Sequence, residues 1–159
     1  MYLESKYRTL TSILKKQHIN NLVGIEACFM LLSYADKINQ ACAKKLGEHQ
    51  LSESRFMILT LLLEYDVLSS KKIATLCGVT KPTMTSLIHS LLKDELVYKN
   101  KTSQDGRQVD IKLTEKGKKL IMNLFQDHIS WIESITKQFS VLELETLTNL
   151  LNKITVSKN

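Results

Sequence analysis

Short hydrogen-bonding side chains and one cation are concentrated between residues 80 and 90. They are Thr80, Lys81, Thr83, Thr85, Ser86, His89 and Ser90. Hydroxyl and imidazole groups can donate and accept hydrogen bonds at the edges of bases, and an ammonium group attracts phosphates. The set therefore indicates non-covalent recognition of a nucleic acid. The structural alternative is a helix whose outer face is simply polar.

A second group of basic side chains follows shortly after this run. Lys99, Lys101 and Arg107 flank a polar stretch that contains Asp105 and Gly106, a pair typical of turns. A protruding basic loop can reach a minor groove, where the negative potential attracts arginine. A solvated loop is the alternative, but the position beside the polar run favours a nucleic-acid contact.

Covalent and metal chemistry have little support in the sequence. The histidines are His18, His49, His89 and His128, and no pair of them, alone or with a cysteine, has the spacing of metal ligands. The chain lacks the G-x-G-x-x-G, P-loop, G-x-S-x-G and H-E-x-x-H signatures. We therefore predict a protein that is not an enzyme and has no metal or other cofactor.

The composition favours a helical, basic protein of the cytoplasm. Of the 159 residues, 43% are hydrophobic, and only 5 Gly and 1 Pro occur, which argues against a loop-rich all-β fold. A net charge of +6 suits a polyanionic partner, although solvated lysines would give the same value. The 3 cysteines form no C-x-x-C pair, and neither a signal peptide nor a membrane-spanning stretch is recognisable.

The elements that would position these groups follow from periodicity and capping signals. Apolar residues at helical spacing predict helices over 2–17, 21–46, 52–65, 71–77 and 80–94, and two more after Thr114 and Ser140. Gly47 and Gly78 are expected to end helices. Alternation with a period of two predicts a strand pair at 96–99 and 109–113.

The two short helices before this strand pair have the features of a helix-turn-helix. Ala74 is small where the helices would cross, and Gly78 lies where the backbone must turn. Ser70 and Lys71, at the start of the first helix, are expected phosphate contacts. An ordinary helical hairpin would share the pattern, but a strand pair directly after the second helix is typical of a wing. The residues expected to fill the space between the helices are Val79, Met84, Leu87 and Ile88.

We predict a mainly α fold with a small β-wing, that is, a winged helix-turn-helix with N- and C-terminal dimerisation helices. Residues 1–48 would form the N-terminal dimerisation helices, 49–114 the DNA-binding domain and 115–159 the C-terminal dimerisation helices. The terminal segments are assigned to dimerisation because they are long and apolar enough to need a partner.

Two stretches resemble one known family. The wing stretch from Asp105 to Gly117, DGRQVDIKLTEKG, resembles the signature of the MarR (multiple antibiotic resistance regulator) family, in which D-x-R precedes L-T-x-x-G. Thr80 to Ile88 is similar to that family's recognition helix, and Leu51-Ser52 is similar to the start of its winged domain. The resemblance covers residues 50–155.

The resemblance implies a transcriptional regulator, most often a repressor, that binds a pseudo-palindromic operator in double-stranded DNA as a homodimer. Asp105 would orient Arg107 in the minor groove. A small aromatic or lipophilic effector, bound in a cleft between the dimer helices and the winged domain, would release the DNA. The helix over 2–17 would either extend the dimer interface or fill that cleft.

Two positions need separate interpretation. Glu95 stands where the family often has glycine, so a left-handed backbone there would cost about 1 kcal/mol. Cys28 stands where the hydroperoxide-sensing branch keeps its reactive cysteine, yet Leu32, Cys42 and Glu53 replace the tyrosines that accompany it. Cys28 is therefore either a redox-sensing thiol or a cysteine packed on an apolar stripe.

A different class of function is also open. Some winged helices bind proteins and no DNA. Such modules need no basic wing tip, so Lys81, Lys101 and Arg107 together favour DNA as the partner.

Overall fold

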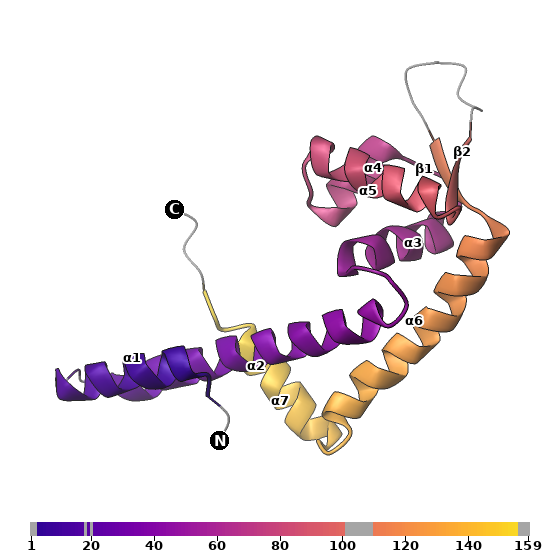
Figure 1. Ribbon diagram of the computed structural model, residues 1–159. Coiled ribbons are helices and arrows are strands. Elements are labelled where there is room, and N and C mark those ends of the chain that lie inside the picture. The colour runs from indigo at the N-terminus through magenta and orange to yellow at the C-terminus, as the bar shows by residue number, and fades with distance from the viewer. Residues whose placement is uncertain (1–2, 18, 20, 101–109, 156–159) are drawn as a thin grey trace. The chain divides into compact units, whose positions relative to one another are not determined.

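The computed structural model describes residues 3–17, 19, 21–100 and 110–155, and the elements follow one another as traced in Figure 1. The fold is mainly helical with a small antiparallel sheet, as the sequence predicts. The chain divides into two compact units, residues 1–58 and 59–159, and the division falls inside helix α3 (Glu53–Tyr65). Among the described helices, none has the length and hydropathy needed to cross a membrane.

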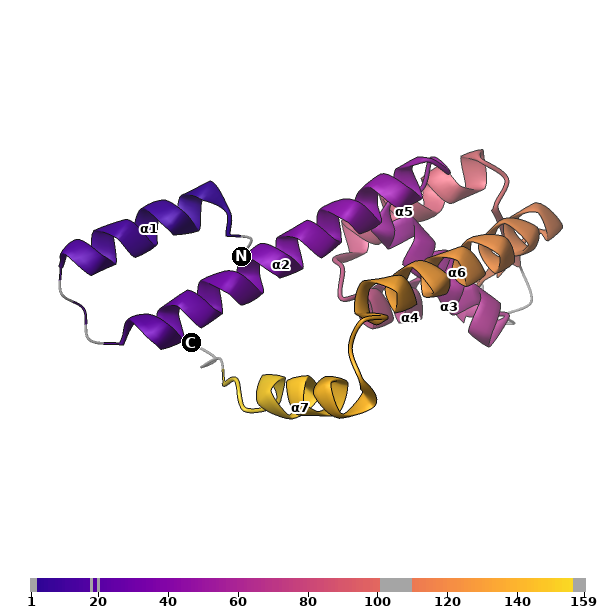
Figure 2. The same cartoon turned by 90° about the horizontal axis from the view of Figure 1, so that it is seen from below.

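The first unit contains a helical hairpin. Helix α1 (Ser5–Lys16) lies alongside α2 (Leu22–Gly47) and runs in the opposite direction (Figure 2). Ion pairs join the two helices at both ends: Lys6 to Asp36 at 3.1 Å and Lys15 to Glu26 at 3.1 Å. The Tyr7 and Phe29 rings stack between these ends, with centroids 4.9 Å apart. The predicted helices 2–17 and 21–46 are thus confirmed, and they pack on each other.

The predicted end of α2 at Gly47 is wrong in its detail. Gly47 is still helical, and the left-handed residue is Gln50, at φ 58°. The Leu51 amide donates to the Leu46 carbonyl oxygen at 3.1 Å, and the Gln50 amide donates to that of Gly47 at 3.0 Å, which is the Schellman pattern of helix ends. Ser52 then caps α3 as predicted, because its hydroxyl accepts from the amide of Arg55 at 3.3 Å.

The second unit contains the helix-turn-helix and the wing. Helices α4 (Ser70–Cys77) and α5 (Lys81–Lys93) pack on each other, and β2 (Val97–Asn100) pairs with β3 (Asp110–Leu113). A third strand, β1 (Leu68–Ser69), pairs with the other edge of β3 and was not predicted, because two residues are too few for a periodicity signal. The core side chains of this unit are Leu59, Leu62, Ile73, Met84, Ile88, Leu91, Leu96, Val97, Ile111, Ile121 and Leu124.

The two C-terminal helices begin at the predicted caps. The Thr114 hydroxyl accepts from the Gly117 amide at the start of α6 (Glu115–Thr136). Ser140 and Glu143 form the capping box of α7 (Val141–Leu151), and hydrogen bonds from Ser140 lower the pKa of the Glu143 carboxyl group. No residue of α7, all of which is described, is buried.

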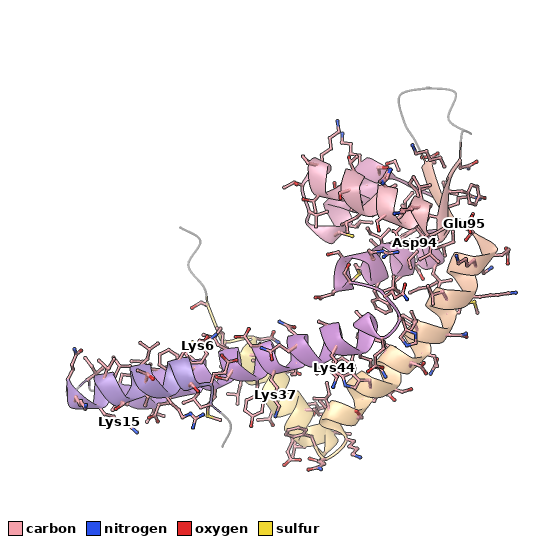
Figure 3. The ribbon with its side chains drawn as sticks, in the orientation of Figure 1. Lys6, Lys15, Lys37, Lys44, Asp94 and Glu95 are labelled. Atoms are coloured by element: carbon pink, nitrogen blue, oxygen red, sulfur yellow. The ribbon has the colours of Figure 1, made fainter. Side chains whose placement is uncertain are left out.

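Helix α5 ends in a second Schellman pattern, with Glu95 as its left-handed residue. The Leu96 amide donates to the Leu91 carbonyl oxygen, and the Glu95 amide donates to the Leu92 carbonyl oxygen, both at 3.0 Å. The φ angle of Glu95 is 59°. The strain expected at Glu95 from the sequence is therefore present. Glu95 lies beside Asp94 at the end of α5 (Figure 3).

Thr114 ties the base of the wing to the end of α5. Its hydroxyl donates to the Glu95 carbonyl oxygen at 2.7 Å, and its amide donates to that of Leu96 at 3.1 Å. The backbones approach so closely that a Cβ on Gly117 would lie 2.9 Å from the carbonyl carbon of Leu96. The Lys116 ammonium group adds a hydrogen bond to the Asp94 carbonyl oxygen at 2.9 Å. We call this set of contacts the wing clamp.

We expect Gly117→Ala to lower the free energy of unfolding by about 3 kcal/mol, because the added methyl group meets backbone atoms that cannot rotate away. Chemical denaturation followed by circular dichroism measures the change. The control is Lys118→Ala in the same turn of α6, where the side chain is exposed. A Gly117→Ala protein as stable as the parent would contradict the close approach.

We expect Glu95→Gly to raise the free energy of unfolding by about 0.5–1 kcal/mol, since glycine adopts a left-handed conformation without strain. Glu95→Ala is the matched control. It removes the same exposed carboxylate, including its 3.8 Å contact with Lys116, but keeps the Cβ and so should bring no gain. Equal stabilities of the two variants in urea would show that the backbone strain is not the cause.

Candidate nucleic-acid interface

The turn between α4 and α5 has the geometry predicted for a helix-turn-helix. Gly78 is left-handed, at φ 64°, and the Val79 amide donates to the Ala74 carbonyl oxygen at 3.1 Å. The Thr80 hydroxyl accepts from the Thr83 amide at 3.4 Å and so caps α5. Met84 and, one turn later, Ile88 are buried, while Val79 and Leu87 are half-buried. The apolar side of α5 is thereby fixed within the second unit.

The opposite side of α5 exposes the polar side chains singled out from the sequence. Of the seven, only Ser90 is half-buried; the exposed ones are Thr80, Lys81, Thr83, Thr85, Ser86 and His89. The Thr80 and Thr83 hydroxyls are 2.9 Å apart, and that of Thr85 donates to the Lys81 carbonyl oxygen at 3.0 Å. These hydroxyls keep free lone pairs, and the six exposed side chains of the row are accessible to a ligand.

The start of α4 carries the two residues expected to contact phosphate. Ser69, the preceding residue, is the cap, because its hydroxyl accepts from the Lys72 amide at 3.3 Å. Ser70 is the first helical residue and is half-buried, whereas Lys71 is exposed. The positive end of the helix dipole and the Lys71 ammonium group are both suited to a phosphate.

The wing strands are confirmed, but most of the predicted wing contacts lie outside the described residues. In the β2–β3 pair, Val97 is opposite Leu113 and Asn100 is opposite Asp110. Lys99 is exposed on β2. Lys101, Asp105 and Arg107 belong to the segment 101–109, which the structure does not describe. Their contacts with DNA stay predictions.

Two lysine contacts near the wing were missed by sequence reasoning. Lys112 on β3 donates to the Asp66 carboxylate at 2.9 Å, and this hydrogen bond raises the pKa of the lysine. Lys116 binds the Asp94 carbonyl oxygen in the wing clamp. Both lysines would otherwise be counted as free positive charge. The L-T-x-x-G spacing was the available signal for the wing clamp, whereas nothing local pairs Lys112 with a residue 46 positions away.

The cysteines do not form a common site. Cys28 is exposed on α2, which differs from the packed position that the apolar stripe suggested. Burial raises the pKa of the Cys77 thiol, and burial together with the negative charge of Glu53 raises that of Cys42, so both favour the unreactive thiol form. Across the described part of the chain, no group of three or more His, Cys, Asp or Glu residues could hold a metal ion.

Comparisons with known proteins agree with this geometry. The profile of the MarR family matches residues 51–109. The chain is 26% identical to the HTH-type transcriptional repressor YetL of Bacillus subtilis over 151 residues, covering 94% of this chain and 90% of YetL. It is 28% identical to the HTH-type transcriptional regulator SarZ of Staphylococcus epidermidis over 127 residues, covering 80% of this chain and 83% of SarZ.

Solved structures share the fold. The MepR–DNA complex of Staphylococcus aureus superposes with a TM-score of 0.68 at 24% identity, covering 79% of this chain and 92% of MepR. The PcaV transcriptional regulator from Streptomyces coelicolor gives a TM-score of 0.66 at 17% identity, covering 76% of this chain and 90% of PcaV. Residues 51–109, which include the exposed polar row on α5, thus match the MarR family, and most of the chain is similar to HTH-type transcriptional regulators.

Proposed function

We propose that this chain is a repressor that binds a pseudo-palindromic operator as a homodimer, with α5 of each protomer in a major groove. The observation that carries the proposal is the exposed polar row of α5, followed directly by a wing whose tip sequence is basic. Two relatives support it: YetL is named a repressor, and MepR has been solved with DNA. No catalytic step is part of the proposal, and the cytoplasm is its expected location because the operator is there.

The exposed apolar surface of the C-terminal helix α7 supports a dimer. Burying one large apolar side chain is worth about 1.5–3 kcal/mol, so a helix without a buried residue needs a partner. Helix α7 has none, and four of its leucines lie on one side. That stripe consists of Leu144, Leu147, Leu150 and Leu151. We assign residues 1–48 and 115–159 to the dimer interface and 49–114 to DNA, and we expect a small aromatic or lipophilic effector to release the operator.

The first experiment is selection from random duplex DNA at two salt concentrations. Enrichment of a pseudo-palindrome with half-sites about one helical turn apart would support a sequence-specific dimer. Salt-sensitive binding without an enriched motif would replace the proposal with a structural role on DNA. An absence of binding would favour the protein-interaction class.

We expect Arg107→Ala to weaken binding to the selected operator by about 1–3 kcal/mol while leaving the fold intact, because it removes a minor-groove contact. Lys81→Ala should weaken binding to all sequences and reduce the salt slope by about 0.9 for each phosphate that is no longer neutralised. Fluorescence anisotropy at several salt concentrations measures both. Lys93→Ala is the control that removes the same charge, because Lys93 is exposed at the C-terminal end of α5, is not among the residues expected to contact DNA and lies outside the segments assigned to the dimer. Unchanged affinity of the Arg107 variant would refute the wing assignment.

We expect Leu147→Glu to raise the dimer dissociation constant about 100-fold, since two copies of the side chain leave the interface. Sedimentation equilibrium measures it. Asn149→Glu adds the same charge on the opposite side of α7 and should leave the dimer unchanged. Leu147 is 40% exposed in the single chain, so its replacement spares the protomer's own core. A fully dimeric Leu147→Glu protein would exclude this stripe from the interface.

A further inference from the structure

The start of α4 is joined to the sheet by a very short strand. Strand β1 has two residues, and its register with β3 pairs Leu68 with Ile111 and Ser69 with Asp110. Ser69 is also the cap of α4, because its hydroxyl accepts from the Lys72 amide at 3.3 Å. The strand runs directly into α4, whose first residues are the expected phosphate contacts (Figure 1). Strands of globular proteins usually have roughly 3–10 residues, so the place of this helix start depends on what else joins β1 to β3.

One side-chain contact continues the pairing of β1 with β3 beyond the strand. The Lys112 ammonium group on β3 donates to the Asp66 carboxylate at 2.9 Å, and Asp66 lies two residues before β1. The Lys112 side chain is only 25% exposed, and its backbone partner on β2 is Tyr98. Lys112 therefore belongs to the middle strand of the sheet and reaches across to the segment that leads into β1. A charge-assisted hydrogen bond of this length is among the stronger polar contacts.

The Asp66 backbone has a conformation that glycine would adopt more easily. Its φ is 58°, and the Val67 amide donates to the Tyr65 carbonyl oxygen at 2.6 Å, so the three residues form a tight turn. A turn of this kind with a positive φ at its centre is rare and strained, although aspartate and asparagine tolerate a positive φ better than most residues. Glycine would remove the strain and also the carboxylate. A backbone cost at a residue whose side chain binds Lys112 indicates a role for the bond.

We propose that Asp66 is a positioning residue for DNA binding, which acts through Lys112 to hold the start of α4 against the middle strand of the sheet. The carboxylate fixes the segment before β1 to β3, and the Ser69 hydroxyl fixes the first turn of α4 to the end of β1. The phosphate-binding end of α4 then keeps its place relative to the wing strands. The inference rests on the proposed DNA binding, since it assigns Asp66 a part in that function. Electrostatics alone predicts the opposite effect, because an exposed aspartate repels a polyanion.

The test separates the bond from the net charge. Asp66→Asn keeps the shape and the tolerance for a positive φ, and Lys112→Met keeps most of the hydrocarbon stem. The double variant lacks the bond but keeps the net charge of +6, because one acidic and one basic residue are lost. We expect it to bind the selected operator about threefold more weakly than the parent and random-sequence duplex DNA equally well, as measured by fluorescence anisotropy. Asp66→Asn alone should also bind the operator more weakly, although it is more positive than the parent.

Hydrogen exchange of the free protein reports the positioning without DNA. The Lys72 amide, which is bonded to the Ser69 hydroxyl, should exchange about threefold faster in the double variant, since the lost bond shifts the local opening equilibrium. Both measurements are made well below the melting temperatures, where global unfolding is negligible. Glu64→Gln is the matched control, because it removes an exposed negative charge two residues from Asp66. It should alter neither the ratio of operator to random-DNA affinity nor the exchange rate.

Three results would overturn the inference while the proposed function stands. They are a double variant that binds the operator as tightly as the parent, an Asp66→Asn protein that binds all DNA more tightly, and an unchanged exchange rate at Lys72. In each case the parent still binds its operator. A parent that selects no operator would instead refute the proposed function, and the role of Asp66 with it.

Discussion

The close approach of Gly117 to the backbone of Leu96 is the constraint on which the DNA-reading unit depends. It lets Thr114 form hydrogen bonds to Glu95, Leu96 and Gly117 at once, at 2.7, 3.1 and 3.0 Å. The last residue before α6 is thereby fixed to the end of α5. Since β3 leads into Thr114 and pairs with both β1 and β2, the strand cannot shift without breaking these bonds. Helix α5 and the wing strands therefore keep a fixed spacing, which the proposed contacts with two neighbouring grooves of one duplex would require.

The same constraint explains why a strained residue is kept. The tight passage from α5 into β2 needs a left-handed residue after the helix, and Glu95 takes that position with φ 59°. Its carbonyl oxygen is the acceptor for the Thr114 hydroxyl. The strain is thus offset by a hydrogen bond that forms only if the turn has this shape.

The helix ends show which boundaries can be predicted from the local sequence and which cannot. Three helices end in the Schellman pattern, with left-handed residues at Gly78, Glu95 and Gln50. Only the first is glycine, the residue type that by itself signals the conformation. The left-handed residue at Glu95 was expected only because the resembling family often has glycine there, and the one at Gln50 was not expected. At Gln50, the burial of the neighbouring Leu46 and Leu51 side chains offsets the free-energy cost of the left-handed conformation. The N-terminal caps Ser52, Thr80 and Thr114 were all predicted, because a cap depends on its own side chain and the next three residues.

The residues of the candidate site likewise include some that the local sequence predicts and some that it does not. The polar row of α5 could be predicted because helical periodicity alone separates it from Met84 and Ile88. Strand β1 and the Lys112–Asp66 pair could not, because each joins residues more than forty positions apart that only the folded sheet brings together. The sequence predicts which side chains face outward on a helix. It does not show which outward lysines already have a partner, and that decides how much of the net charge is available to DNA.

Helix α7 is incompletely packed in the single protomer. It exposes apolar side chains and, apart from Glu143 and Glu145, no charge, so the free energy gained by covering it comes from apolar area. Its two carboxylates and the absence of basic residues also reduce like-charge repulsion between two chains of net charge +6. This helix therefore has both the apolar area and the charge that the proposed dimer requires.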